Sequence, residues 1–145
     1  RTWFEVHQEN CRGHYCCPCC GYPTLSRRDN CEMCNLCTWE DDGQDDNTAQ
    51  EVWGGPNGDY SLREARDNFE EHLTMFRSSE PGTSERINFD LRIQDAKRKL
   101  TASYDRLIIE REENKVDSVW QEIDSNTDTL NSLRTTIARG RAYDK

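Results

Sequence analysis

Seven of the eight cysteines lie within residues 15–42, and their spacing constrains the fold more than any other feature of the chain. Two Cys-x-x-Cys pairs stand out, Cys17 with Cys20 and Cys34 with Cys37, and thirteen residues separate the two pairs. This spacing is typical of a four-thiolate zinc site, in which two short turns (knuckles) each supply two sulfurs. The sequence therefore predicts one structural Zn²⁺ bound by these four cysteines.

Each knuckle also contains an overlapping Cys-x-x-Cys frame that would use other ligands. Gly21 directly follows Cys20, and a glycine tolerates the positive φ that a knuckle requires after its second cysteine. Cys37 stands two residues before Trp39, an aromatic residue that can cover the site. These features favour Cys17, Cys20, Cys34 and Cys37 as the four ligands. They leave open whether an assigned ligand is replaced by one of the remaining thiols, Cys11, Cys16, Cys19 and Cys31.

A site of four cysteines has no open coordination position, so its predicted role is structural and not catalytic. A structural metal supplies folding free energy that a small core cannot, and only 33% of this chain is hydrophobic while 32% is charged. No histidine or carboxylate pair stands out as catalytic, so we expect that the protein is not an enzyme. The reduced thiols that zinc binding needs favour a cytoplasmic location.

Helical periodicity begins at Ser61, where Ser61 and Glu64 have the spacing of a capping box. Apolar residues at intervals of three and four then predict an amphipathic helix over residues 61–77. Residues 78–84 are rich in Ser, Gly and Pro and are predicted to be a linker.

Beyond the linker, two apolar seams at helical spacing predict an α-helical hairpin over residues 85–145. We place its turn at residues 124–128, which are rich in turn and cap formers, and keep residues 113–115 as the alternative. The predicted fold is α+β. Residues 1–77 would form a small zinc ribbon with two knuckles on short β-hairpins and a packing helix, followed by the helical hairpin.

The net charge of −9 is concentrated at the cysteine-rich end, where residues 1–59 contain four Arg and eleven Asp or Glu. Such acidity disfavours a nucleic-acid backbone as the partner and favours a basic protein surface. No apolar run approaches the length of a membrane span, so we expect no membrane partner. The residues predicted to contact the partner are Glu40, Asp41, Asp42, Asp45 and Asp46.

Three ordered blocks of the sequence resemble the cysteine-rich CPCC family of small bacterial proteins. The blocks are Cys-Pro-Cys-Cys-Gly-Tyr at residues 17–22 with Thr-Leu at residues 24–25, Cys-x-x-Cys-x-Trp-Glu-Asp-Asp-Gly at residues 34–43, and Gly-Pro-Asn-Gly at residues 55–58 followed by Ser-Leu-Arg-Glu-Ala-Arg-x-Asn-Phe at residues 61–69. The resemblance implies a zinc-ribbon-like module. It also hints at immunity, because similar small proteins are encoded near bacterial toxin genes.

These observations lead to one main functional hypothesis and two alternatives. The main hypothesis is a non-catalytic zinc-binding immunity protein, which neutralises a cognate, basic toxin such as a nuclease by binding it. The first alternative is a zinc-ribbon regulator that binds nucleic acid through Arg27 and Arg28. The second is a thiol redox protein that uses Cys17 and Cys20.

Overall fold

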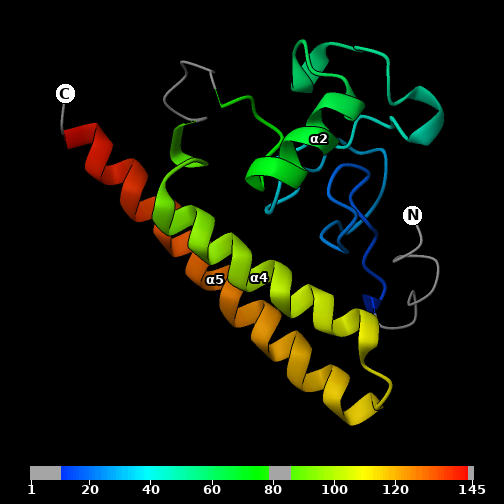
Figure 1. Cartoon of the computed structure of the whole chain (residues 1–145), viewed down its shortest axis with the longest axis vertical. Helices are drawn as coiled ribbons and strands as arrows, with labels where there is room; N and C mark the ends of the chain where they lie inside the picture. The colour runs from blue at the N-terminus through cyan, green and yellow to red at the C-terminus, as the bar shows by residue number, and fades with distance from the viewer. Residues whose placement is uncertain (1–10, 79–85, 144–145) are drawn as a thin grey trace. The chain divides into compact units, whose positions relative to one another are not determined.

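The structure is a computed structural model that describes residues 11–78 and 86–143. The chain divides into two compact units, unit 1 at Arg1–Arg77 and unit 2 at Ser78–Lys145 (Figure 1). Apart from Ser78, the predicted linker over residues 78–84 lies outside the described residues. None of the helices in the described part of the chain has both the length and the apolar character needed to cross a bilayer.

The first half of unit 1 contains almost no regular strand. Across residues 11–78, strand pairing consists of two isolated antiparallel bridges, Tyr15 with Leu25 and Met33 with Glu40. The β-hairpins predicted for a zinc ribbon are thus each reduced to a single bridge. The backbone explains this, because positive φ angles at Asp29, Cys31 and Thr38 (55°, 54° and 78°) interrupt the extended conformation that a strand requires.

Asn57 holds the loop after the second knuckle in place. It ends the short 3₁₀ helix η3 (Gly55–Asn57), which follows η2 (Asp46–Thr48) in the chain. The Asn57 side chain is buried, and its Nδ2 donates to the Glu40 carbonyl at 2.8 Å while its Oδ1 accepts from the Glu40 N–H at 3.1 Å. One side-chain amide therefore satisfies both backbone groups of Glu40.

The helix α2 (Leu62–His72) begins where the sequence predicts but ends earlier. Ser61 is its N-cap, and the Ser61 side chain accepts from the Glu64 N–H at 3.1 Å. Leu73 then adopts a left-handed conformation with φ 60°, which ends the helix five residues before the predicted end at residue 77. The chain turns back instead, and the Met75 N–H donates to the Cys37 carbonyl at 2.9 Å.

The buried face of α2 packs on the segments around the knuckles. Leu62, Ala65 and Phe69 are its buried residues. The rings of Tyr22 and Phe69 meet edge to face with centroids 6.3 Å apart. The contact joins α2 to the residue that follows the first knuckle.

Unit 2 is a helical hairpin, as predicted. The helices α4 (Leu91–Ile109) and α5 (Glu113–Tyr143) lie side by side in Figure 1. Tyr104 and Trp120 face each other across them, with ring centroids 6.3 Å apart. The buried seam consists of Ile93, Ala96, Leu100, Tyr104 and Leu107 on α4 and Val116, Val119, Trp120, Ile123, Leu130 and Ile137 on α5.

The preferred position of the hairpin turn is wrong. The chain turns at residues 110–112, directly before the alternative site at residues 113–115, and α5 continues through residues 124–128. The Glu110 carboxylate accepts from the N–H groups of Arg111 and Glu112 at 3.1 and 3.0 Å, which stabilises this turn.

The polar residues at 124–128 do not interrupt α5 because they lie off its apolar face. Asp124, Ser125 and Asp128 are exposed, whereas Asn126 reaches towards α4. Its Nδ2 donates to Ser103 Oγ at 2.8 Å. These polar side chains therefore bind solvent or a partner on α4, and the helix continues through them.

Candidate metal centre

The two knuckles share one backbone pattern. In each, the N–H of the first cysteine donates to the carbonyl of the residue five positions later, and its carbonyl accepts from the N–H four positions later. The N–H to O distances are 2.9 Å from Cys17 to Tyr22, 2.8 Å from Gly21 to Cys17, 2.8 Å from Cys34 to Trp39 and 2.9 Å from Thr38 to Cys34. Two equivalent turns thus present their cysteines in the same way.

Both turns need a residue with positive φ after the second cysteine. Gly21 has φ 83° in the first knuckle, which agrees with the reason for choosing this frame. Thr38 has φ 78° at the equivalent place in the second knuckle. A β-branched residue is strained at positive φ, so the second knuckle forms at a cost in conformational energy at Thr38.

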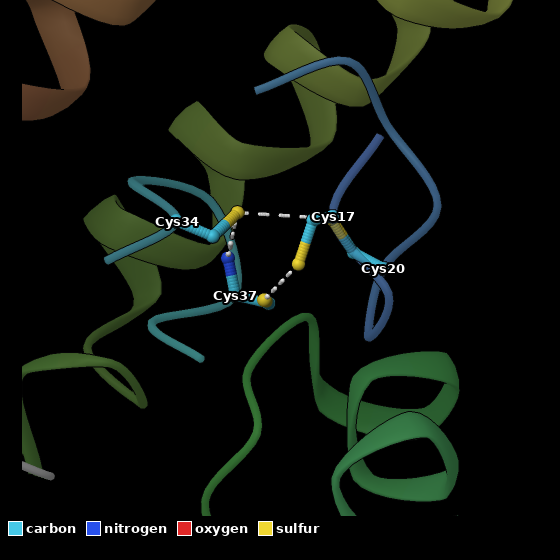
Figure 2. Close-up of side chains that lie close together, drawn as sticks. All are labelled: Cys17, Cys20, Cys34 and Cys37. Atoms are coloured by element: carbon cyan, nitrogen blue, oxygen red, sulfur yellow. Dashed lines mark hydrogen bonds between the residues drawn. The ribbon is translucent and has the colours of Figure 1, made fainter. Parts of the chain in front are cut away.

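The predicted ligands Cys17, Cys20, Cys34 and Cys37 come together as one group, with all four sulfurs within 4.8 Å of one another (Figure 2). Cys17 Sγ lies 3.5 Å from Cys37 Sγ, and Cys20 Sγ lies 3.7 Å from Cys34 Sγ. A tetrahedron with zinc–sulfur bonds of about 2.3 Å places sulfurs about 3.8 Å apart, whereas a disulfide needs about 2.05 Å. The geometry therefore suits four ligands around one ion, and these cysteines could hold a metal.

The sulfurs of the second knuckle receive hydrogen bonds from backbone N–H groups and contact a hydroxyl. Cys34 Sγ accepts from the Cys37 N–H at 3.5 Å and lies 3.0 Å from Thr24 Oγ1. Cys37 Sγ accepts from the Trp39 N–H at 3.4 Å. Such bonds orient a metal-binding thiolate and spread its negative charge.

Burial makes four thiolates costly without a cation. It raises the pKa of the thiols of Cys17, Cys20 and Cys37 well above the usual value. At Cys34 burial also opposes ionisation, but hydrogen bonds from the other three cysteines and the Cys37 N–H outweigh it and hold the pKa well below the usual value. A divalent metal ion supplies the positive charge that lets all four sulfurs be thiolates.

The other cysteines lie outside this group. Among the described residues, the group close enough to bind a metal contains none of them. Cys11, Cys16 and Cys19 are buried and Cys31 is exposed. The alternative frames, Cys16 with Cys19 and Cys31 with Cys34, are therefore not those that the fold assembles.

The predicted partner-binding residue Asp41 has a different role, because it is fully buried. Its Oδ2 accepts from Arg28 Nε and from the Asp29 N–H, both at 2.8 Å, and its Oδ1 accepts from the Gly43 N–H at 3.3 Å. These bonds fasten the loop between the knuckles to the chain after the second knuckle. Sequence reasoning assigned Asp41 to the surface because its arginine partner lies thirteen residues away.

Asp45 and Asp46 are also paired within unit 1. Arg28 Nη2 lies 3.1 Å from Asp45 Oδ2, and Arg66 Nη2 lies 2.7 Å from Asp46 Oδ1. Arg66 Nε also donates to the Pro18 carbonyl at 2.8 Å, which ties α2 to the first knuckle. These carboxylates support the fold around the four cysteines, although Asp46 is itself exposed.

The two remaining predicted contact residues, Glu40 and Asp42, are half-buried. Asp42 Oδ1 accepts from the Gln44 N–H at 3.1 Å. Two further acidic residues that the sequence analysis did not single out, Asp67 and Glu70, lie on the exposed face of α2. Their spacing of three residues within a predicted helix was the available signal. No described residue forms an ion pair with either carboxylate.

The geometry gives little support to the alternative functions. A redox Cys-x-x-Cys pair would begin a helix, whereas Cys17 and Cys20 lie in a turn well before α2. Arg28 is engaged with Asp41 and Asp45, so it offers a nucleic acid less positive charge than the sequence indicated.

Two short turns that bring four cysteine sulfurs together, with a capped helix packed beside them, define a small cysteine-rich module with a candidate metal site. A family model described as Cysteine-rich CPCC matches residues 15–85. The match is to the same cysteine-rich CPCC family that the sequence resembles, which confirms the resemblance. The match ends before the helical hairpin of unit 2. Comparison with curated proteins and with solved structures found no match.

Proposed function

We propose that unit 1 is a structural zinc module and that the chain acts by binding another protein, without catalysis. The observation that carries the zinc proposal is that the sulfurs of Cys17, Cys20, Cys34 and Cys37 all lie within 4.8 Å of one another. Four thiolates suit Zn²⁺ and fill its coordination sphere, which leaves no position for a substrate or water. When bound, the ion supplies folding free energy to a unit with little regular secondary structure.

Charge supports a basic protein surface as the partner. Residues 1–77 contain seven Arg and no Lys against fifteen Asp and Glu, which gives a net charge of −8. Asp41, Asp45 and Asp46 are used internally, so the surface that we propose includes Asp67 and Glu70 on α2. Carboxylates that lack an internal partner keep their full attraction for basic groups and speed association.

The biological role that we propose is neutralisation of a cognate bacterial toxin in the cytoplasm. Its support is the acidic surface, the reduced thiols that zinc requires, and the resemblance of the cysteine-rich segment to small proteins encoded near toxin genes. A basic nuclease is the toxin class that this surface fits best.

Metal analysis tests the zinc proposal. Chain purified without chelators is expected to contain one zinc per molecule, and Cys34→Ser to contain none or to bind it far more weakly. Cys31→Ser is the matched control, because Cys31 is an exposed cysteine outside the group and its loss should leave the zinc content unchanged. Zinc-free native chain, or full zinc content in Cys34→Ser, would refute the proposal.

Co-expression tests the neutralising role. A toxin encoded beside the gene for this chain is expected to be harmless when both are produced, and the two proteins should co-purify. Reversal of both α2 charges (Asp67→Lys with Glu70→Lys) should slow association, while the same reversal on α5 (Asp124→Lys with Asp128→Lys) should not. Toxicity that persists despite soluble, zinc-loaded chain contradicts this role.

A further inference from the structure

We propose that Thr24 is a positioning residue of the metal centre, and that its hydroxyl donates a hydrogen bond to the Cys34 sulfur that strengthens metal binding. Thr24 Oγ1 lies 3.0 Å from Cys34 Sγ, which is closer than the Cys37 N–H lies to Cys34 Sγ (3.5 Å) or the Trp39 N–H to Cys37 Sγ (3.4 Å). The inference rests on the proposed function, because it requires that the four cysteines bind a metal.

The direction of this hydrogen bond follows from the metal-bound state. A thiol and a hydroxyl can each donate, but a metal-bound cysteine is a thiolate and has no proton to give. The Thr24 hydroxyl must then be the donor and Cys34 Sγ the acceptor. A hydrogen bond to a charged acceptor is stronger than one between neutral groups.

In the folded unit, backbone hydrogen bonds next to Thr24 hold its hydroxyl in position independently of the metal ligands. The Thr24 N–H donates to the Tyr22 carbonyl at 2.8 Å. The next residue, Leu25, is fully buried and exchanges two backbone hydrogen bonds with Tyr15, at 2.8 and 3.0 Å. The side chain is therefore attached to a fixed strand bridge, and its hydrogen bond costs little entropy to form.

Thr24 also links the two knuckles. It follows the first knuckle in the chain but contacts Cys34, a ligand from the second. Cys34 consequently has two donors, this hydroxyl and the Cys37 N–H at 3.5 Å. Hydrogen-bonding partners of metal ligands orient the ligand and tune it, and their loss typically weakens metal binding about 10- to 100-fold.

Three variants separate the hydroxyl from the shape of the side chain. Thr24→Val removes the hydroxyl and keeps the volume, so it should lower the affinity for Zn²⁺ by about 10-fold or more in competition with a chelator. Thr24→Ser keeps the hydroxyl and should restore most of the affinity. Thr74→Val is the matched control, because Thr74 is a fully buried threonine whose hydroxyl lies 3.5 Å from the Cys37 carbonyl and not from a sulfur.

A spectroscopic readout distinguishes tuning of the sulfur from a general loss of stability. In the Co²⁺-loaded protein, Thr24→Val should shift the sulfur-to-cobalt charge-transfer bands to lower energy, because Cys34 becomes a stronger electron donor. Thr24→Ser and Thr74→Val should keep the native bands. Equal Zn²⁺ affinity and unchanged Co²⁺ bands in Thr24→Val would overturn the inference while leaving the zinc proposal intact.

A measurement on the native chain covers the case in which Thr24→Val does not fold. With ¹¹³Cd²⁺ bound, the Thr24 hydroxyl proton should exchange slowly and show a coupling to the metal through the Cys34 sulfur. Absence of that coupling overturns the inference. A native chain that binds neither Zn²⁺ nor Cd²⁺ overturns both this inference and the zinc proposal.

Discussion

Unit 2 owes its fold to a periodic apolar seam, whereas unit 1 depends on a sulfur cluster and on buried polar contacts. In α4 and α5 the buried side chains recur every three or four residues, and each turn of helix adds another pair to the same interface. In unit 1 the described backbone contains two isolated bridges and one helix of more than three residues, α2. Its buried residues combine four cysteines and the carboxylate of Asp41 with scattered apolar side chains such as Leu36, Trp39 and Leu62.

The difference shows how a chain with few hydrophobic residues can still form two folded units. A helical hairpin needs only a narrow stripe of apolar side chains, because its backbone hydrogen bonds lie within each helix. In a unit made of turns, each backbone N–H and carbonyl group needs its own hydrogen-bond partner, because no regular helix or sheet supplies one. A metal ion helps such a unit to fold because it holds several turns together at once.

Metal removal should produce the largest difference between the units. A chelator is expected to unfold unit 1, because the apparent free energy of structural zinc binding is about 10–16 kcal/mol. The amides of α4 and α5 should keep their protection against hydrogen exchange, and circular dichroism should retain most of the helical signal. Added Zn²⁺ should restore unit 1. Loss of protection in both units together would contradict the comparison.

A cavity in the helical seam should affect unit 2 alone. Leu100 is fully buried, so Leu100→Ala is expected to destabilise unit 2 by about 2–5 kcal/mol in urea unfolding. Leu91→Ala is the control on the same helix, since Leu91 is 82% exposed and its loss should change stability by less than about 0.5 kcal/mol. Zinc release from Leu100→Ala would show that the two units do not unfold separately.

The buried carboxylate of unit 1 should matter less than the metal but more than a surface ion pair. Asp41→Asn keeps the size of the side chain but puts a donor either at the Oδ2 position, opposite both Arg28 Nε and the Asp29 N–H, or at the Oδ1 position, opposite the Gly43 N–H, so unit 1 should lose about 1–3 kcal/mol. Asp46→Asn weakens an exposed pair and should cost about 0.5 kcal/mol. Thermal unfolding of the zinc-loaded chains gives both values, and equal effects would argue against the role of Asp41.

The strained residue of the second knuckle should have a smaller effect than the loss of the Asp41 carboxylate. Thr38→Gly removes the penalty of a β-branched residue at φ 78° and should stabilise the zinc-loaded unit by about 1 kcal/mol. Gly21→Ala places a side chain at φ 83° in the first knuckle and should destabilise it by a similar amount. Melting temperatures that move in the same direction for both variants would show that the two knuckles are not equivalent.

The sequence was most informative where one residue decides a local geometry. Gly21 indicated that Cys17 and Cys20 are the ligands of the first knuckle, because few residues other than glycine tolerate the positive φ after the second cysteine. The described fold brings together the four cysteines that were predicted. Ser61 indicated the start of α2 for the same kind of reason, since a cap depends on residues a few positions away. The second knuckle offered no such signal, because Thr38 occupies the place that a glycine would mark.

The sequence was least informative where the structure depends on contacts between residues that are far apart in the chain. The carboxylates at residues 40–46 looked like surface charge because nothing local shows that Arg28 and Arg66 reach them. Residues 124–128 looked like a turn because their composition was weighed above the seam that continues to Leu130. The segments around the knuckles looked like hairpins, but their positive φ angles follow from the packing of the whole unit.

The pairing of Asn57 with Glu40 has a consequence for how this unit behaves at high concentration. In the bridge between Met33 and Glu40 the backbone hydrogen bonds are made by the flanking residues, so the N–H and carbonyl of Glu40 point away from Met33. These outward groups are what an incoming strand of another chain would bind. The Asn57 amide already occupies both of them, at 2.8 and 3.1 Å, and so imitates a neighbouring strand. We therefore expect the Gly-Pro-Asn-Gly turn to hinder edge-to-edge pairing with another chain at Glu40.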